Sequence, residues 1–163
     1  LLWTTIEIES RKSLFEDENV KNISEYNARH KEKMPRIVFF IDDLADLMLD
    51  SSLDKYIESA ICDIDGRKID CGIHLLVSTQ RPSKIIITER LKKFIPARIA
   101  FKVFSHYDSR VILDTEGAGK LLGAGDMLIN VPGKTDMLRV QGAWLPDQLI
   151  RPLVSSCDYT KNK

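Results

Sequence analysis

The chain has 163 residues, enough for one compact domain with its own hydrophobic core. Its 24 Lys and Arg residues balance 24 Asp and Glu residues, so bulk charge gives no argument for a nucleic-acid partner. No apolar run approaches the roughly 18 residues that a membrane-spanning helix needs, and the chain starts with neither a basic leader nor Met. We therefore expect a segment of a longer protein. Any contact with DNA would come from a local patch or from parts outside this segment.

The apolar pattern predicts helices that alternate with strands. In chain order we expect helices over 1–18 and 24–30, a strand over 37–41, a helix over 53–65, a strand over 72–79, one or two helical turns over 88–94, a strand over 97–103, a helix over 109–122, strands over 125–131 and 137–141, and a last helix over 146–156. This alternation predicts an α/β fold with a mainly parallel sheet and a late β-hairpin. Residues 1–157 are expected to form part of one domain, and 158–163 a polar tail.

The strand over 37–41 is a continuous apolar run, which is typical of burial on both faces, and Asp42 and Asp43 follow it. An acidic residue at the carboxyl end of a buried strand lies where α/β proteins bind ligands. In P-loop NTPases such an aspartate helps to hold magnesium on the nucleotide, and the next residue usually positions the attacking water. Taken alone, the pattern suits a strand-ending turn better.

Two further signals are weaker by themselves. Thr79 and Gln80 end the next apolar strand, where they would orient water or sense a terminal phosphate; a polar turn before Pro82 is the alternative. Arg67 follows the helix over 53–65 and would reach a neighbouring subunit as an arginine finger, whereas a solvated surface arginine is the simpler interpretation.

No phosphate-binding loop is found in the sequence. Gly133-Lys134-Thr135 ends like one, but Leu128 stands where the loop's first glycine is required. Gly119-Lys120 is followed by Leu121, which has no hydroxyl for magnesium. The three cysteines form no CxxC pair and the three histidines have no ligand spacing, so we expect neither zinc nor disulfides.

Taken together, these blocks resemble the motor domain of the FtsK/SpoIIIE family of DNA translocases, from about residue 1 to residue 149. The order and spacing of the blocks make chance similarity very improbable. The matching stretches are the opening helix with Trp3, Glu7, Glu9 and Arg11, then residues 22–27, 41–48, 72–82, 95–103, 108–114, 117–128 and 139–142.

The resemblance implies part of a RecA-like P-loop NTPase fold. It also implies a hexameric ring with ATP and Mg2+ between subunits, and movement along double-stranded DNA in bacterial chromosome partition and cell division. The motor would lie in the cytoplasm, with the whole protein at the inner membrane. By position, Asp42 matches the Walker B aspartate that meets the metal, Thr79 and Gln80 match the phosphate-sensing strand end, and Arg67 matches the finger that acts in trans.

Three departures from the family pattern bear on activity. Asp43 stands where the family usually has a catalytic Glu, and the shorter side chain withdraws the carboxylate by about 1.5 Å. About two extra residues separate Arg67 from Gly72. The phosphate loop is absent, so we expect the chain alone to be inactive. A related secretion or conjugation motor and a degenerate, non-hydrolysing ring module remain as alternatives.

A basic segment is the candidate for the DNA-contacting lining of the ring. Its residues are Arg81, Lys84, Arg90, Lys92 and Lys93. A solvated basic face is the alternative interpretation.

Overall fold

The computed structural model describes residues 1–49, 54–65 and 70–157. It contains two compact units, Leu1–Pro96 and Ala97–Lys163, and each has a sheet of its own. The elements are α1 (Leu2–Asp17), α2 (Ile23–Arg29), β1 (Ile37–Ile41), α3 (Leu44–Met48), α4 (Asp54–Asp65), β2 (Ile73–Val77), α5 (Glu89–Phe94), β3 (Arg98–Ala100), α6 (His106–Leu113), the 3-10 turn η1 (Ala118–Lys120), β4 (Asp126–Asn130), β5 (Leu138–Gln141) and α7 (Asp147–Ser156).

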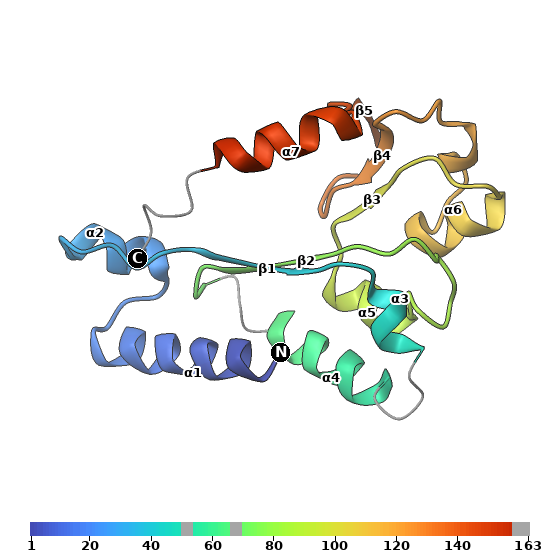
Figure 1. Ribbon diagram of the computed structural model, residues 1–163. Helices are drawn as coiled ribbons and strands as arrows, with labels where there is room; N and C mark the ends of the chain where they lie inside the picture. Colours follow the sequence, from blue (N-terminus) through green and yellow to red (C-terminus); the bar gives the residue numbers. More distant parts are fainter. Residues whose placement is uncertain (50–53, 66–69, 158–163) are drawn as a thin grey trace. The chain divides into compact units, whose positions relative to one another are not determined.

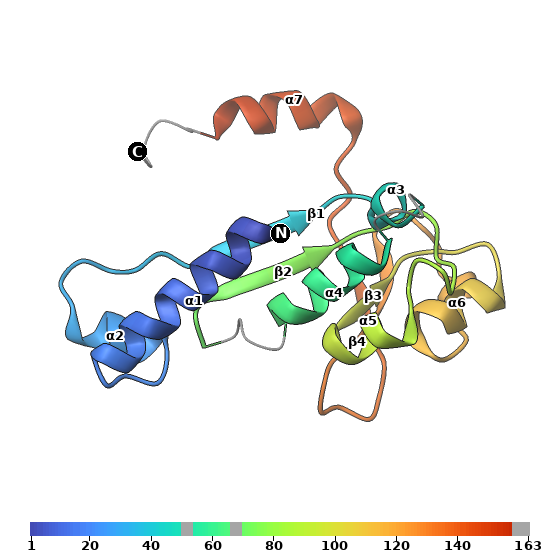
Figure 2. The same cartoon turned by 90° about the horizontal axis from the view of Figure 1, so that it is seen from below.

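In the first unit, β1 and β2 run parallel and α1 and α4 cover one side of them (Figures 1 and 2). The register pairs Ile37 with Ile73 and Ile41 with Val77. Beneath the strands, Ile41 packs with Ile57 and other apolar residues of α3, α4 and α5 into one core cluster. The predicted strand over 37–41 is therefore confirmed at both ends.

The opposite side of this sheet is open. Val38, Phe40 and Leu76 are 66%, 52% and 54% exposed. The expectation that the strand over 37–41 is buried on both faces is wrong. Successive side chains of a strand point to opposite sides, and within this unit helices cover one side of the two strands.

A buried arginine ties α1 to the segments that lead into both strands. Arg11 is only 4% exposed, and its guanidinium donates to the backbone carbonyls of Pro35 and Cys71, each at 2.9 Å. Its Nε also donates to Glu7 at 2.7 Å. A guanidinium offers five donors in a fixed fork, which lets one side chain serve three acceptors. The starts of β1 and β2 are thus fixed to the same turn of α1.

Glu58 links α4 to α5. Its carboxylate accepts a hydrogen bond from Thr88, the residue that caps the N-terminus of α5, and lies 3.8 Å from the guanidinium of Arg90. Thr88 in turn accepts from the amide of Leu91. The start of α5 is therefore held by a side chain of α4 as well as by its own cap.

The second unit holds the sheet β3–β4–β5, in which both pairs are antiparallel. The predicted hairpin is confirmed as β4–β5. The strand predicted over 97–103 is β3, which is shorter and pairs antiparallel with β4. Among the described residues, parallel pairing is therefore confined to β1 and β2.

The helix predicted over 109–122 begins and ends earlier, as α6. Ser105 caps its start by accepting from the amide of Asp108 at 3.0 Å. Asp114 ends it in the left-handed conformation, with φ 62°. Residues 118–120 form η1 instead, and Ala118 lies in the core of this unit.

An ion pair stabilises the turn before β4. Asp126 is 4% exposed and accepts two hydrogen bonds from Arg139, at 3.0 and 2.7 Å. It also accepts from the amide of Leu122 at 2.8 Å. These bonds, that to Arg139 foremost, lower the pKa of Asp126 to about 2.

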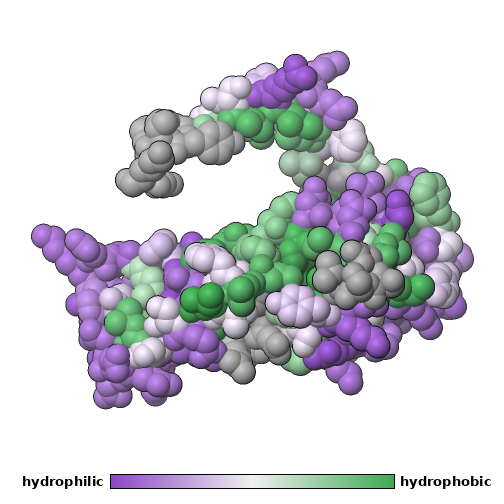
Figure 3. Space-filling view, turned by 60° about the horizontal axis from the view of Figure 1, so that its bottom comes forward, coloured by the Kyte–Doolittle hydropathy of each residue, from purple (hydrophilic) through white to green (hydrophobic). Residues whose placement is uncertain are grey.

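The last helix, α7, presents apolar side chains to solvent. Figure 3 shows them gathered along one side of the helix, and they are Leu149, Ile150, Leu153 and Val154. Within the part of the chain that the structure describes, no helix combines the length and apolar character needed to cross a membrane. The predicted tail over 158–163 lies outside the described residues.

Candidate functional site at the ends of β1 and β2

Four polar residues meet where the two parallel strands end side by side. Ser78 donates from Oγ to Oδ1 of Asp42 at 2.8 Å. Thr79 donates from Oγ1 to Oδ1 of Asp43 at 3.1 Å. The strand register pairs Ile41 with Val77, so these two bonds continue the same register into the side chains. The carboxyl ends of parallel strands are where open α/β sheets bind ligands.

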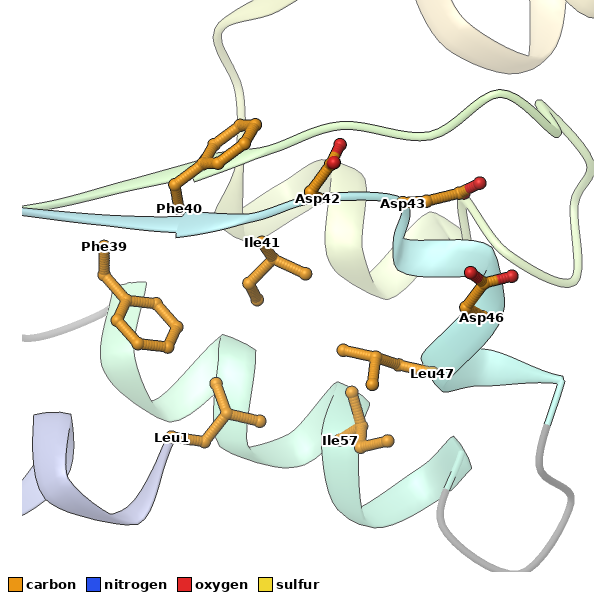
Figure 4. A pocket seen from close by; sticks show the side chains of 9 residues that line it. All are labelled: Leu1, Phe39, Phe40, Ile41, Asp42, Asp43, Asp46, Leu47 and Ile57. Carbon is orange, nitrogen blue, oxygen red and sulfur yellow. The ribbon is translucent and has the colours of Figure 1, made fainter. Parts of the chain in front are cut away.

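Asp42 keeps one carboxylate oxygen available. Its side chain is exposed, and Figure 4 shows it on the side of β1 that carries Phe40, pointing away from α4. Oδ1 accepts the Ser78 hydroxyl, whereas Oδ2 makes no hydrogen bond to any described residue. The sequence prediction of an acidic ligand at the strand end therefore fits this geometry.

The carboxylate of Asp43 already accepts hydrogen bonds from neighbouring residues. The residue lies in the left-handed region with φ 49° and ψ 78°, and its Oδ1 caps α3 by accepting from the amide of Ala45 at 3.3 Å. The same oxygen accepts from Thr79. Aspartate tolerates this backbone conformation better than most residues because its short side chain bonds locally. Oδ1 therefore already accepts two hydrogen bonds, and Oδ2 is the oxygen that remains to bind a further group.

A pocket of about 410 Å³ lies beside this end of β1 (Figure 4). Its lining combines three acidic residues with six apolar ones, and these residues are Asp42, Asp43, Asp46, Leu1, Phe39, Phe40, Ile41, Leu47 and Ile57. A mixed lining of apolar side chains and a few polar groups is typical of ligand sites.

The donor set fits magnesium only as part of a nucleotide complex. Among residues 1–49, 54–65 and 70–157, no group of three His, Cys, Asp or Glu side chains is placed to hold a metal ion. Magnesium is usually bound by one or two carboxylates while substrate phosphates and water complete its octahedron. The open oxygen of Asp42 suits that arrangement. The sequence segments that imitate a phosphate loop belong to the second unit, Gly119–Lys120 in η1 and Gly133–Lys134 at the β4–β5 turn.

The structure brings some predicted site residues together. Asp42, Asp43 and Thr79 meet, as the register requires. Gln80 is exposed, and its side chain makes no hydrogen bond within the described part of the chain. Arg67, the predicted finger, lies outside the described residues. Sequence reasoning missed Ser78, whose place opposite Asp42 follows from the register once the pairing of β1 with β2 is known.

The five basic residues of the candidate DNA lining differ in their surroundings. Lys92 pairs with Glu89 at 3.1 Å, and its side chain is only 8% exposed. Arg90 is half-exposed and approaches Glu58. Arg81, Lys84 and Lys93 are exposed. An exposed basic group is better placed to meet DNA phosphates than a buried one. By this criterion Lys92 is the least accessible of the five, and the lining formed by Arg81, Lys84, Arg90, Lys92 and Lys93 remains a prediction.

Comparison with solved structures identifies the fold. The pCW3 conjugation coupling protein TcpA, in its monomer form with ATPgS, matches with a TM-score of 0.78 and 27% identity, over 90% of this chain and 43% of that chain. The type VII secretion ATPase EccC of Thermomonospora curvata matches with a TM-score of 0.72 and 21% identity, over 88% of this chain and 17% of that chain. The α/β fold predicted as a partial RecA-like motor domain is thereby confirmed.

Sequence comparison points the same way. The model described as FtsK/SpoIIIE family matches residues 1–84. DNA translocase SftA of Bacillus subtilis is 46% identical over 160 residues, which are 95% of this chain and 17% of that protein. DNA translocase FtsK of Clostridium acetobutylicum is 43% identical over 159 residues, 94% of this chain and 20% of that protein. The chain thus spans about a fifth of the length of these curated relatives. The chain belongs to the FtsK/SpoIIIE family.

Proposed function

We propose that the protein containing this chain is an ATP-driven translocase of double-stranded DNA. The observation that carries the proposal is the exposed Asp42 carboxylate at the end of β1, with one oxygen bonded by Ser78, the residue after β2, and the other available. Identities of 43–46% to proteins named DNA translocase support the same activity. The whole protein would work as a hexameric ring in bacterial chromosome partition and cell division, at the inner membrane with its motor in the cytoplasm.

In this proposal the chain contributes one wall of the ATP site. Asp42 would help to hold the Mg2+ that accompanies the nucleotide, and that ion would supply positive charge next to the phosphates. The cradle for the phosphates would come from a glycine loop elsewhere in the protein. Thr79 and Gln80 would sense the terminal phosphate, and Arg67 would reach the site of a neighbouring subunit. The 163 residues alone would then be inactive.

Asp43 favours slow hydrolysis. Its carboxylate is short, and Oδ1 already accepts from Ala45 and Thr79. Only Oδ2 remains to orient the attacking water, and a displacement of about 1 Å costs on the order of a hundredfold in rate. The same observation supports a second candidate function, a ring module that binds ATP without hydrolysing it.

The DNA grip would come from exposed basic groups of the ring. Arg81, Lys84, Arg90, Lys92 and Lys93 are the candidates, with Lys92 the least accessible, and phosphate contacts of this kind bind DNA without regard to sequence. A related motor for conjugation or secretion would be built alike, so stimulation by DNA is the distinguishing property.

The test is the ATPase rate of the full-length protein with and without double-stranded DNA. The matched variant is Asp42→Asn, which keeps the size of the side chain and the Ser78 hydrogen bond but loses the charge. We expect DNA to raise the ATPase rate of the wild type. Asp42→Asn should have no ATPase activity with or without DNA. Bound ATP without hydrolysis would favour the ring module, and hydrolysis unaffected by DNA would favour a secretion motor.

A further inference from the structure

Ser78 makes four hydrogen bonds to four consecutive residues, 41 to 44. Its amide donates to the carbonyl of Ile41 at 2.9 Å, and its carbonyl accepts from the amide of Leu44 at 2.7 Å. Its hydroxyl bonds Asp42 at 2.8 Å and accepts from the amide of Asp43 at 3.2 Å. The two backbone bonds fix where this residue stands relative to the end of β1.

The hydroxyl has only one direction in which to donate. A serine hydroxyl carries one proton and two lone pairs. The amide of Asp43 can only donate, so it occupies a lone pair of Oγ. The proton is therefore directed at Oδ1 of Asp42, the remaining polar atom bonded to Oγ among the described residues.

We propose that Ser78 is the positioning residue of Asp42, holding its carboxylate so that Oδ2 faces the cation carried by the bound nucleotide. This inference rests on the proposed function. Carboxylates that bind metals are themselves hydrogen-bonded, and the loss of such a partner typically weakens metal affinity 10–100-fold. Without the hydroxyl, the exposed Asp42 side chain would be free to rotate, and the cation would have to order it on binding.

A positioning role differs from a structural one in what substitution changes. Ser78→Ala keeps both bonds made by the Ser78 backbone and hence the strand end, but removes the bond to the Asp42 carboxylate and the acceptor of the Asp43 amide. Ser78→Thr keeps a hydroxyl at the same place and suits extended backbone. Ser83→Ala is a matched control, because Ser83 is half-buried in the same connection and its hydroxyl bonds no described residue.

The experiment measures Mn2+ binding to the full-length protein in the presence of ATPγS, by electron paramagnetic resonance. Mn2+ replaces Mg2+ at sites built from carboxylates and phosphates. We expect Ser78→Ala to bind Mn2+ about tenfold more weakly than wild type. Ser78→Thr and Ser83→Ala should match wild type, and ATPγS affinity in EDTA should be unchanged in all four proteins.

The outcomes separate this inference from the proposed function. Equal Mn2+ affinity of Ser78→Ala and wild type would overturn the positioning role and leave the proposed function standing. A Ser78→Ala variant that loses Mn2+ and ATPγS binding in EDTA alike would assign Ser78 a structural role instead. A wild-type protein that binds no Mn2+ with ATPγS would overturn both.

Discussion

Replacing Asp43 by Glu should have two opposing effects. It should destabilise the start of α3, and it should lengthen the side chain that would orient the attacking water. The change lengthens the side chain to the glutamate that the family resemblance leads us to expect at this position. It also acts on a residue that caps α3 and adopts φ 49°. We expect Asp43→Glu to destabilise the start of α3 even where it speeds hydrolysis.

The magnitude follows from two local terms. Loss of a good N-cap side chain costs about 1 kcal/mol. The left-handed conformation costs an ordinary residue roughly 1–2 kcal/mol, of which aspartate recovers part through its local bonds. The sum is about 2 kcal/mol, which corresponds to about a 30-fold increase in the open population of this helix.

Amide hydrogen exchange across residues 44–48 of the full-length protein measures that population. Asp43→Asn is the matched control, because asparagine keeps the capping oxygen and tolerates the backbone conformation but has no charge. We expect faster amide exchange in Asp43→Glu than in Asp43→Asn or the wild type. The ATPase rate of Asp43→Glu should equal or exceed that of the wild type, and both should exceed that of Asp43→Asn. Protection in Asp43→Glu equal to wild type would refute the idea that the carboxylate of Asp43 is committed to the cap.

Three further predictions concern the scaffold. Arg11→Met removes two hydrogen bonds to backbone carbonyls, of which the bond to Cys71 is buried and the bond to Pro35 part-buried, and should lower the free energy of unfolding by about 3 kcal/mol in urea titrations. The folded pKa of Asp126 is about 2, below its ordinary value of 3.8, so this carboxylate contributes stability above pH 3.8 that is lost as the pH falls towards 2. In Arg139→Gln, an NMR titration of this carboxyl should show its pKa raised towards the ordinary value, because the largest cause of the shift is removed while the Leu122 amide bond remains. Gly133→Ala should cost about 1 kcal/mol through its φ of 80° alone, and Gly125→Ala more, because its Cβ would lie 2.6 Å from a backbone oxygen. Equal melting temperatures for the two alanine variants would contradict that ranking.

Strand positions were predictable where the sequence marks both ends. β1 and β2 are short apolar runs that end in polar residues, so composition and boundaries agree. The five-residue α3 was missed because it lies directly after the strand and its cap, Asp43, was interpreted as a catalytic position or as part of a strand-ending turn, not as a helix cap. The helix predicted over 109–122 was misplaced because the cap at Ser105 and the left-handed end at Asp114 were not recognised.

The features that could not be predicted depend on which strands pair with each other. The residues of β3 alternate as a strand should, but nothing local says that they pair antiparallel with β4. Similarly, an all-apolar strand cannot tell which of its sides will be covered, so the open side of β1 was not foreseen. Asp42 was identified from its place after the strand, whereas Ser78 requires the register between two strands that are 36 residues apart.

In β1, residues that pack inside the first unit alternate with residues on its open side, and the two sets should tolerate substitution differently. Ile37, Phe39 and Ile41 pack inside their own unit, so substitutions there should be restricted by folding alone. Val38 and Phe40 alternate with them on the same strand but are exposed, so the unit Leu1–Pro96 tolerates polar replacements there at little cost. In a mutational scan of the whole protein, the intolerance observed at these two positions therefore measures contacts made outside that unit.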